Sequence, residues 1–398
     1  MSFPVFDFLE RRADIAPSRV AMEDLASGVS FTYRAMHERT GRTASLLEAC
    51  GIAAGERVAV LCRNRVEFFE LLFACARIGA LLVPLNWRLA VPEQVYILCD
   101  ASVKALVVEE AFAPVIAPLT KALSDVRVVG LDFAPDGGAS LDALLAGASG
   151  DGRAPHVDTS SPLLIVYTSG TTGHPKGAVL RQEALVWNAV MSQHMHDMTA
   201  ADHILTVLPM FHVGGLNIQT TPALQLGATV TLHPRFAPEA ALEAIEHDRP
   251  TLTVLVPATI QAMIEHPRWT ATKLDSLRAV TTGSTQVPQR LVDAFTGRNV
   301  AVLQVYGSTE TCPVAVYTRL SGDWHRPAST GLPGLACEAR IVDESGSEVA
   351  PGQAGEVVVR GPNVFFEYWG NAQATTETLR EGWYHSGDIG TRDGDGHF

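Results

Sequence analysis

Short runs of aliphatic and β-branched residues alternate with longer helical patterns through most of this chain. Residues 57–61 read Arg-Val-Ala-Val-Leu, which is typical of a buried strand, and residues 66–77 have apolar side chains on one face of a predicted helix. Further strands are predicted at residues 81–84 and 105–108, on either side of a predicted helix at residues 92–99. This alternation predicts parallel sheets that are covered by helices on both faces.

The second half of the chain repeats the alternation and then changes in character. A polar stretch rich in Gly and Asp, residues 134–159, precedes it and is expected to run over the surface. Strands are predicted at residues 163–167, 203–208, 229–232, 253–256 and 279–282. Beyond residue 306 helical patterns thin out, and short strands at residues 338–342 and 355–360 lie between Gly- and Pro-rich turns. The last part therefore reads as a small antiparallel, barrel-like unit.

The length and composition support several folding units with buried cores. The chain has 398 residues, of which 47% are hydrophobic and 18% charged. We predict an α/β protein with two helix-covered, mostly parallel β-sheet subdomains and a small antiparallel β-barrel-like subdomain. The predicted boundaries are residues 1–160, 161–305 and 306–398.

The charge balance and the cysteines exclude some classes of function. A net charge of -13 disfavours binding to nucleic acid or to an anionic membrane, although a locally basic pocket for phosphates stays compatible with it. The six cysteines form no Cys-x-x-Cys pair, which favours reduced thiols. The N-terminus lacks the features of a signal peptide, and the most apolar stretch, residues 71–85, is too short and too broken to span a bilayer. We expect a cytoplasmic protein.

The segment at residues 167–177 reads Tyr-Thr-Ser-Gly-Thr-Thr-Gly-His-Pro-Lys-Gly and directly follows a predicted strand. Glycines let the backbone turn its amides toward an anion, hydroxyls add donors, and Lys176 supplies a cation for a polyphosphate. The order differs from the Walker pattern, and another strand follows the lysine, so the loop would join two strands. An ordinary Ser/Thr/Gly hairpin is the alternative. The candidate phosphate-binding residues are Thr168, Ser169, Gly170, Thr171, Thr172, Gly173 and Lys176.

This segment resembles the signature of the adenylate-forming superfamily, which includes acyl- and aryl-CoA synthetases, firefly luciferase and peptide-synthetase adenylation domains. Four more segments follow in the family's order, at residues 209–215, 282–285, 306–310 and 384–388, so that the resemblance covers nearly the whole chain. The match at residues 282–285 is loose, because many relatives have Gly-Gly-Ala there. Taken alone, His212 would be read as a structural histidine, and the other segments as ordinary turns.

The resemblance implies a role for each segment. Tyr306 would stack on adenine, Thr309 would touch the α-phosphate, Glu310 would hold Mg²⁺, and Asp388 would bind the ribose hydroxyls. An aromatic face suits a purine, and a carboxylate suits a hard cation. The implied nucleotide contacts also include Gly283, Ser284 and Gly307, and the implied catalytic residues are Lys176, His212, Thr309 and Glu310. The implied substrate pocket comprises His212, Val213, Gly214, Gly283, Gly307, Pro313 and Val314.

The implied reaction is the ATP-dependent, AMP-forming conversion of a monocarboxylic acid into a coenzyme A thioester, through an acyl-adenylate. The stretch around His212 has no carboxylate that could pair with an ammonium group, so an α-amino acid is not expected. Residues 309–314 resemble hydroxycinnamate ligases, while Gly214 and Gly215 favour a wide cavity. A medium- or long-chain fatty acid and an aryl acid both stay open.

Full-length family members continue beyond a Gly-Tyr-Phe-like segment, matched here by residues 396–398, into a small C-terminal domain with a catalytic lysine. The sequence therefore predicts the large N-terminal part of such an enzyme. Two alternative functions stay open: loading of a carrier-protein thiol, and a catalytically idle nucleotide-binding fragment. The oligomeric state, including a homodimer, also stays open.

Overall fold

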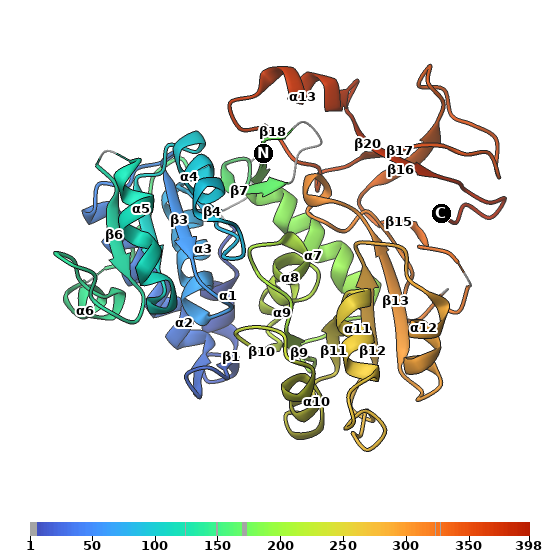
Figure 1. Ribbon diagram of the computed structural model, residues 1–398, viewed down its shortest axis with the longest axis horizontal. Helices are drawn as coiled ribbons and strands as arrows, with labels where there is room; N and C mark the ends of the chain where they lie inside the picture. Colours follow the sequence, from blue (N-terminus) through green and yellow to red (C-terminus); the bar gives the residue numbers. More distant parts are fainter. Residues whose placement is uncertain (1–5, 124, 149, 169–172, 323, 327) are drawn as a thin grey trace. The chain divides into compact units, whose positions relative to one another are not determined.

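The computed structural model describes residues 6–123, 125–148, 150–168, 173–322, 324–326 and 328–398. The chain forms two compact units (Figure 1). The first unit holds the described residues up to Glu183, together with Pro209–His212 and Phe366–Ala372. The second unit holds Ala184–Leu208, Val213–Phe365 and Gln373–Phe398.

The first unit is built on a seven-stranded sheet with the order β18-β8-β7-β4-β3-β5-β6. Strands β7, β4, β3, β5 and β6 are parallel, whereas β8 and β18 run antiparallel to their neighbours. The strands are β3 (Arg57–Leu61), β4 (Leu81–Pro84), β5 (Ala105–Val108), β6 (Arg127–Gly130), β7 (Pro162–Thr168), β8 (Lys176–Arg181) and β18 (Glu367–Tyr368). The predicted mostly parallel sheet is confirmed here.

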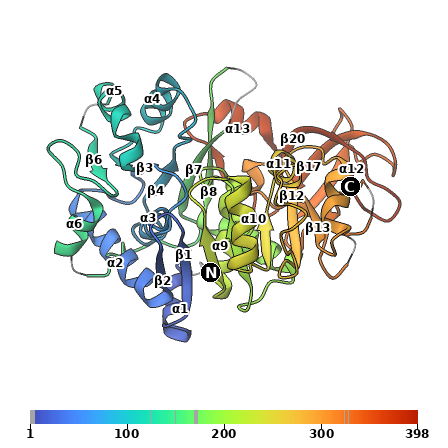
Figure 2. The same cartoon turned by 60° about the horizontal axis from the view of Figure 1, so that its bottom comes forward.

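Helices cover both faces of this sheet (Figure 2). Helix α3 (Val66–Ile78) contacts β4 and β7 and is buried on every side, which explains why its sequence is apolar nearly all round. It ends at Gly79, whose φ of 73° is the left-handed conformation typical of a helix C-terminus. The other face is packed by α4 (Val91–Asp100) and α5 (Ile116–Lys121). The unit also contains α1 (Phe8–Ile15), α2 (Tyr33–Ala49), α6 (Leu141–Gly147), the 3-10 helix η1 (Glu110–Val115) and the hairpin β1 (Val20–Asp24)–β2 (Val29–Thr32).

The second unit contributes strands in the order β15-β14-β13-β12-β11-β9-β10. Strands β10, β9, β11, β12 and β13 are parallel, and β14 and β15 are antiparallel. Their bounds are β9 (His203–Thr206), β10 (Thr229–Leu232), β11 (Leu252–Val254), β12 (Ala279–Gly283), β13 (Ala301–Tyr306), β14 (Val316–Tyr317) and β15 (Leu332–Pro333). The predicted second parallel sheet is confirmed.

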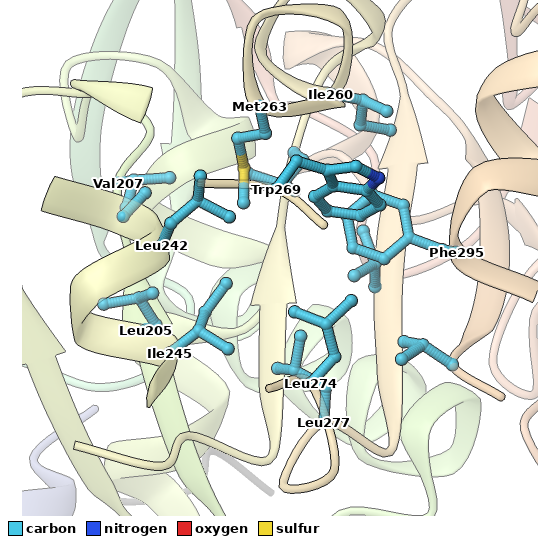
Figure 3. Packing of buried hydrophobic residues seen from close by; sticks show 14 of the residues in the cluster. Leu205, Val207, Leu242, Ile245, Ile260, Met263, Trp269, Leu274, Leu277 and Phe295 are labelled. Atoms are coloured by element: carbon cyan, nitrogen blue, oxygen red, sulfur yellow. The ribbon is translucent and has the colours of Figure 1, made fainter. Parts of the chain in front are cut away.

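Helices of the second unit pack a large apolar core against these strands (Figure 3). Trp269 and Phe295 meet edge to face at its centre, with ring centroids 5.0 Å apart. The helices are α8 (Val213–Asn217), α9 (Thr220–Leu226), α10 (Pro238–His247), α11 (Pro257–Ile264) and α12 (Gln289–Thr296), and α7 (Gln182–His196) begins in the first unit.

A small antiparallel sheet, also in the second unit, has the order β16-β17-β20-β19. Its strands are β16 (Glu338–Val342), β17 (Gly355–Arg360), β19 (Leu379–Arg380) and β20 (Trp383–Gly390), and α13 (Ala372–Thr378) precedes β19. The predicted antiparallel unit is confirmed, but among the described residues its four strands form an open sheet and not a closed barrel. The division at residues 160 and 305 stays a prediction. No helix in the described part of the chain is long and apolar enough to cross a membrane.

Candidate active site

The predicted phosphate segment lies on the hairpin of β7 and β8 in the first unit. Thr168 ends β7 and pairs with Lys176, which begins β8, so a strand does follow the loop as the sequence predicts. The Thr168 hydroxyl donates to the carbonyl of Lys176 at 3.4 Å. Ser169, Gly170, Thr171 and Thr172 lie outside the described residues. From Leu164 to Thr168 the stem of the hairpin is therefore a continuous antiparallel pair, with the candidate cation Lys176 at its end.

Aromatic packing holds the base of this hairpin. An added Cβ at Gly177 would lie 2.7 Å from Ile165 Cγ2 and 3.0 Å from Tyr167 Cζ, so glycine makes room for the tyrosine ring. The Tyr167 hydroxyl donates to Asp100 Oδ2 at 2.5 Å. The glycine after Lys176 thus has a packing role, which the phosphate-loop interpretation did not foresee.

His212 also belongs to the first unit and is exposed. Partial desolvation of the ring by the surrounding protein lowers the pKa of His212, and the positive charge of Arg88 lowers this pKa further. The Arg88 guanidinium lies 4.9 Å from the Trp87 ring centroid and 5.8 Å from that of Phe211. The lowered pKa therefore favours the neutral form of the imidazole at pH 7.

In the second unit, Tyr306 and Asp388 meet directly although 82 positions separate them in the sequence. The Tyr306 hydroxyl donates to Asp388 Oδ2 at 2.9 Å. Burial raises the pKa of Tyr306, and the carboxylate of Asp388 raises it further, while a hydrogen bond with Ser386 opposes them. The tyrosine at the end of β13 is thus joined to the aspartate of β20.

The turn that presents Asp388 is shaped by Glu356 on β17. Glu356 Oε2 lies 2.8 Å from His385 Nδ1, and Oε1 accepts from the amide of Gly387 at 2.9 Å. Burial of the carboxyl group alone would raise the pKa of Glu356, but these hydrogen bonds outweigh burial and lower the pKa. Ser386 donates from its hydroxyl to the carbonyl of Val357 at 2.6 Å. Sequence reasoning missed Glu356, because no motif marks a carboxylate within a strand.

Glu310 lies in a short 3-10 turn, Thr309–Thr311, directly after β13. Its side chain is buried, and its carbonyl accepts from the amide of Phe365 at 2.7 Å. The buried Tyr384 hydroxyl lies 3.5 Å from Glu310 Oε2 and accepts from Ser308 Oγ at 3.0 Å. Tyr384 thus links the Glu310 turn to β20. The segment at residues 384–388 was singled out from the sequence, but no role was predicted for Tyr384.

Two predicted pocket glycines are required by close backbone packing. An added Cβ at Gly283 would lie 2.3 Å from the carbonyl oxygen of Val305, its partner on β13. At Gly307 it would lie 1.7 Å from the carbonyl oxygen of Pro313. Ser284 follows with a φ of 73°. Their small size therefore serves the turn itself, whether or not a ligand lies against it.

The remaining predicted pocket residues are held by two buried amides. Asn188 on α7 donates to the carbonyl of Asn217 at 2.7 Å and accepts from the amide of Val314 at 3.0 Å. Asn363 donates to the carbonyl of Val314 at 3.1 Å. Helix α8, which contains Val213 and Gly214, is thereby tied to the segment of Pro313 and Val314. The sequence predicted no role for either amide, since nothing nearby in the sequence marks their partners.

Gly214 differs from the other two glycines. Apart from the backbone of its own helix, an added Cβ there would meet only Ile218 Cδ1, at 3.9 Å. The methyl group of an alanine would therefore fit at this position without a clash. The absence of a side chain leaves room on α8.

The described residues contain no group of three or more His, Cys, Asp and Glu side chains that could hold a metal ion by themselves. A single buried carboxylate such as that of Glu310 suits Mg²⁺, which is commonly bound by one or two carboxylates together with phosphate oxygens. The donor set therefore fits an ion that arrives with a nucleotide.

Comparison with known proteins agrees with this architecture. Residues 9–369 match the model of the AMP-binding enzyme family, so the chain belongs to that family of adenylate-forming enzymes. It is similar to an indoleacetate–CoA ligase of Aromatoleum aromaticum, with 48% identity over 98% of this chain and 76% of the relative. A feruloyl-CoA synthase of Amycolatopsis sp is 38% identical over the same shares of both chains.

A solved structure of the N-terminal domain of FACL13 from Mycobacterium tuberculosis superimposes with a TM-score of 0.90 at 31% identity. The match covers 98% of this chain and 97% of that one. Together these relatives define an AMP-forming acyl-CoA synthetase, an acid–thiol ligase. The resemblance drawn from the sequence is confirmed, and enzymes of this class use ATP and coenzyme A.

Proposed function

We propose that this enzyme activates an aryl-substituted monocarboxylic acid. In the first step a carboxylate oxygen attacks the α-phosphorus of ATP, and pyrophosphate leaves with the electrons of the broken P–O bond. In the second step the thiolate of coenzyme A attacks the acyl carbon and AMP leaves, which gives a thioester. Neither step needs an oxidant or a reductant.

The identity of 48% with an indoleacetate–CoA ligase, over 98% of the chain, is the observation that carries the substrate class. The lower identity of 38% with a feruloyl-CoA synthase points the same way, because both named acids carry an aromatic ring. The open space at Gly214 agrees with a bulky acyl group. Helix α8, Val213–Asn217, has no charged residue, so it favours neither an amino acid nor a dicarboxylate.

In this proposal the residues of the first unit act on phosphate and carboxylate. Lys176 neutralises charge that develops on the phosphates, a type of stabilisation that is strongest where water is excluded. The hydroxyls and amides of residues 168–173 add donors to the same anion. His212, neutral because its pKa is lowered, donates a hydrogen bond to the acid without forming an ion pair with it.

The residues of the second unit bind the nucleoside and the metal in this proposal. Tyr306 stacks on adenine, and Asp388 accepts hydrogen bonds from the ribose hydroxyls. Thr309 donates to the α-phosphate, and Glu310 would hold Mg²⁺, which when bound neutralises the phosphates. Gly283, Ser284 and Gly307 bring backbone close to the ligand. The direct contact of Tyr306 with Asp388 supports their shared role in one nucleoside site.

A screen of pyrophosphate release tests the substrate class. We would compare indole-3-acetic, ferulic, phenylacetic, octanoic, palmitic and malonic acids at saturating ATP. The best aryl acid should exceed octanoic acid in kcat/KM by at least about tenfold, or about 1.4 kcal/mol of transition-state binding. A preference for octanoic or palmitic acid would instead assign a fatty-acid ligase.

Two variants of Gly214 sharpen this test. Gly214→Phe should fill the open space on α8. It should therefore reduce kcat/KM for indole-3-acetic acid, the larger, bicyclic acid, more than for phenylacetic acid. Gly214→Ala, which adds one carbon in free space, serves as the matched control and should leave this ratio unchanged. An equal loss for both acids in Gly214→Phe would remove Gly214 from the pocket.

The acceptor thiol is tested separately. With the preferred acid, free coenzyme A should give a thioester faster than a pantetheinylated carrier protein does. The reverse order would favour carrier loading, and no acyl-adenylate with any acid would leave a nucleotide-binding protein without this activity.

A further inference from the structure

Strand β18 comes from far along the chain and pairs with the strand that begins at Lys176. In the antiparallel register, Tyr368 lies opposite Ala178 and Glu367 opposite Val179. The amide of Phe366 donates to the carbonyl of Val179 at 2.8 Å, and that of Trp369 to the carbonyl of Gly177 at 2.7 Å. Residues 366–369, called the strap below, therefore form the edge of the seven-stranded sheet beside β8.

Each aromatic ring of the strap faces a cation. The Phe366 ring centroid lies 3.6 Å from the guanidinium carbon of Arg181, and the Trp369 ring centroid lies 5.3 Å from the guanidinium carbon of Arg57. The Tyr368 ring centroid lies 5.2 Å from Lys176 Nζ. All three distances fall within the range of cation–π attraction.

The register explains why Tyr368 reaches Lys176. Successive side chains of a strand point to opposite faces, so Lys176 and Ala178 share one face of β8. Tyr368 lies opposite Ala178, which makes Lys176 its diagonal neighbour, within reach of long and aromatic side chains. The strand pairing thus places the tyrosine ring within reach of the lysine side chain.

The Tyr368 ring is held in place by its surroundings, because its side chain is buried, whereas Lys176 is only partly buried. Its neighbour Trp369 is fixed by a hydrogen bond from Nε1 to the carbonyl of Asp100 at 3.2 Å. A free lysine side chain samples many rotamers and loses that freedom when it binds an anion. A ring that already restricts the ammonium group reduces this loss.

We propose that Tyr368 is a positioning residue that holds the Lys176 ammonium group ready for the phosphates of ATP. This inference rests on the proposed function of Lys176 and adds the residue that orients it. If Tyr368 served packing alone, an aliphatic side chain of similar bulk would replace it without an effect specific to ATP.

The test compares Tyr368→Phe, which keeps the ring, with Tyr368→Leu, which removes it. ATP affinity is measured by titration, and kcat and the KM for ATP by pyrophosphate release. Tyr368→Leu should weaken ATP affinity and raise the KM for ATP about two- to fivefold, the worth of a cation–π contact at a partly exposed site. The KM for the acid should not change, and Tyr368→Phe should retain most of the affinity.

Phe366→Leu is the matched control, because it removes a ring of the same strap from a cation outside the phosphate segment. It should leave ATP affinity unchanged. The second comparison is a double-mutant cycle. In a protein that already carries Lys176→Ala, Tyr368→Leu should cause no further loss of ATP affinity. Thermal unfolding of each variant shows whether it is folded.

The outcomes separate two failures. If Lys176→Ala leaves ATP affinity and adenylation unchanged, the proposed role of Lys176 is wrong. Suppose instead that Lys176→Ala weakens ATP affinity and adenylation. If Tyr368→Leu then lowers ATP affinity equally with and without Lys176, or if Phe366→Leu lowers it as much as Tyr368→Leu does, only the positioning role of Tyr368 is overturned.

Discussion

The β7–β8 hairpin in the first unit and the turn after β13 in the second hold their candidate residues by different physical means. The hairpin uses an antiparallel strand pair and aromatic rings, with Lys176 at the start of a strand and the Tyr368 ring next to its ammonium group. The turn after β13 uses hydroxyl and carboxylate hydrogen bonds between distant segments, such as that of Tyr306 with Asp388. A pairing of strands tolerates the loss of one side chain, whereas a hydrogen-bonded assembly depends on each member.

This difference predicts where substitutions act. In the hairpin the backbone fixes positions, so changes should affect the ligand more than the fold. Around the turn after β13 the same side chains hold both the ligand and one another, so that a change should affect binding and stability together.

Lys176→Ala should reduce the rate of adenylation by at least about a hundredfold, because it removes a cation that stabilises charge in the transition state. Thermal stability should stay close to that of the parent protein, since the strand pairing of β8 does not need this side chain. Pyrophosphate release measures the rate. Lys121→Ala, at the end of α5, is the matched control and should have no effect.

Asp388→Asn should weaken nucleotide binding by about tenfold or more, because a hydrogen bond to a charged group is worth roughly 1.5–3 kcal/mol. Tyr306→Phe, which removes the hydroxyl that donates to Asp388, should cost less. Titration with AMP measures both, and the exposed Asp395→Asn serves as the control. Strict additivity of the Tyr306 and Asp388 substitutions would contradict a coupled pair.

The contrast between the two regions also explains what the sequence could predict. The phosphate segment is continuous, and its strand–loop–strand context followed from residues 162–181 alone. The parallel sheets followed from alternating apolar runs, whose local patterns were strong. The structural roles of Glu356, Tyr384, Asn188 and Asn363 could not be predicted, because each side chain acts on a partner at least 29 positions away.

The antiparallel pairing predicted for the last part is confirmed, but the strand pattern could not specify whether this barrel-like unit closes. Short strands between turns specify antiparallel pairing, but closure depends on whether the two edge strands meet. Here β16 and β19 lie at opposite ends of the strand order. That is a tertiary property, which the strand pattern alone does not encode.

Gly307→Ala should destabilise the second unit by about 1–3 kcal/mol, the usual cost of overpacking. The added carbon would collide with the backbone at Pro313, which cannot move as a flexible side chain could. Gly214→Ala is the matched control, because its added carbon enters free space and alanine favours a helix. Thermal unfolding should therefore show a lower midpoint for Gly307→Ala and an equal or higher one for Gly214→Ala. Equal loss in both would contradict the packing role of Gly307.

The smallest effect concerns the charge beside His212. Arg88 lowers the pKa of His212, so Arg88→Met, which keeps much of the stem but removes the charge, should raise that pKa toward its usual range near 6.5. If the acid step needs a neutral imidazole, activity falls as the pH drops through the pKa of His212. The acidic limb of kcat/KM for the acid should then move to higher pH in Arg88→Met.

Two measurements connect this shift to His212 itself. The NMR titration of the His212 ring, assigned by its loss in His212→Gln, should move to higher pH in Arg88→Met and stay in place in Arg88→Lys. In His212→Gln the acidic limb should no longer respond to Arg88→Met. A ring that titrates at the same pH in all Arg88 variants would mean that burial alone lowers its pKa, and that the first unit tunes this histidine through packing rather than through a neighbouring charge.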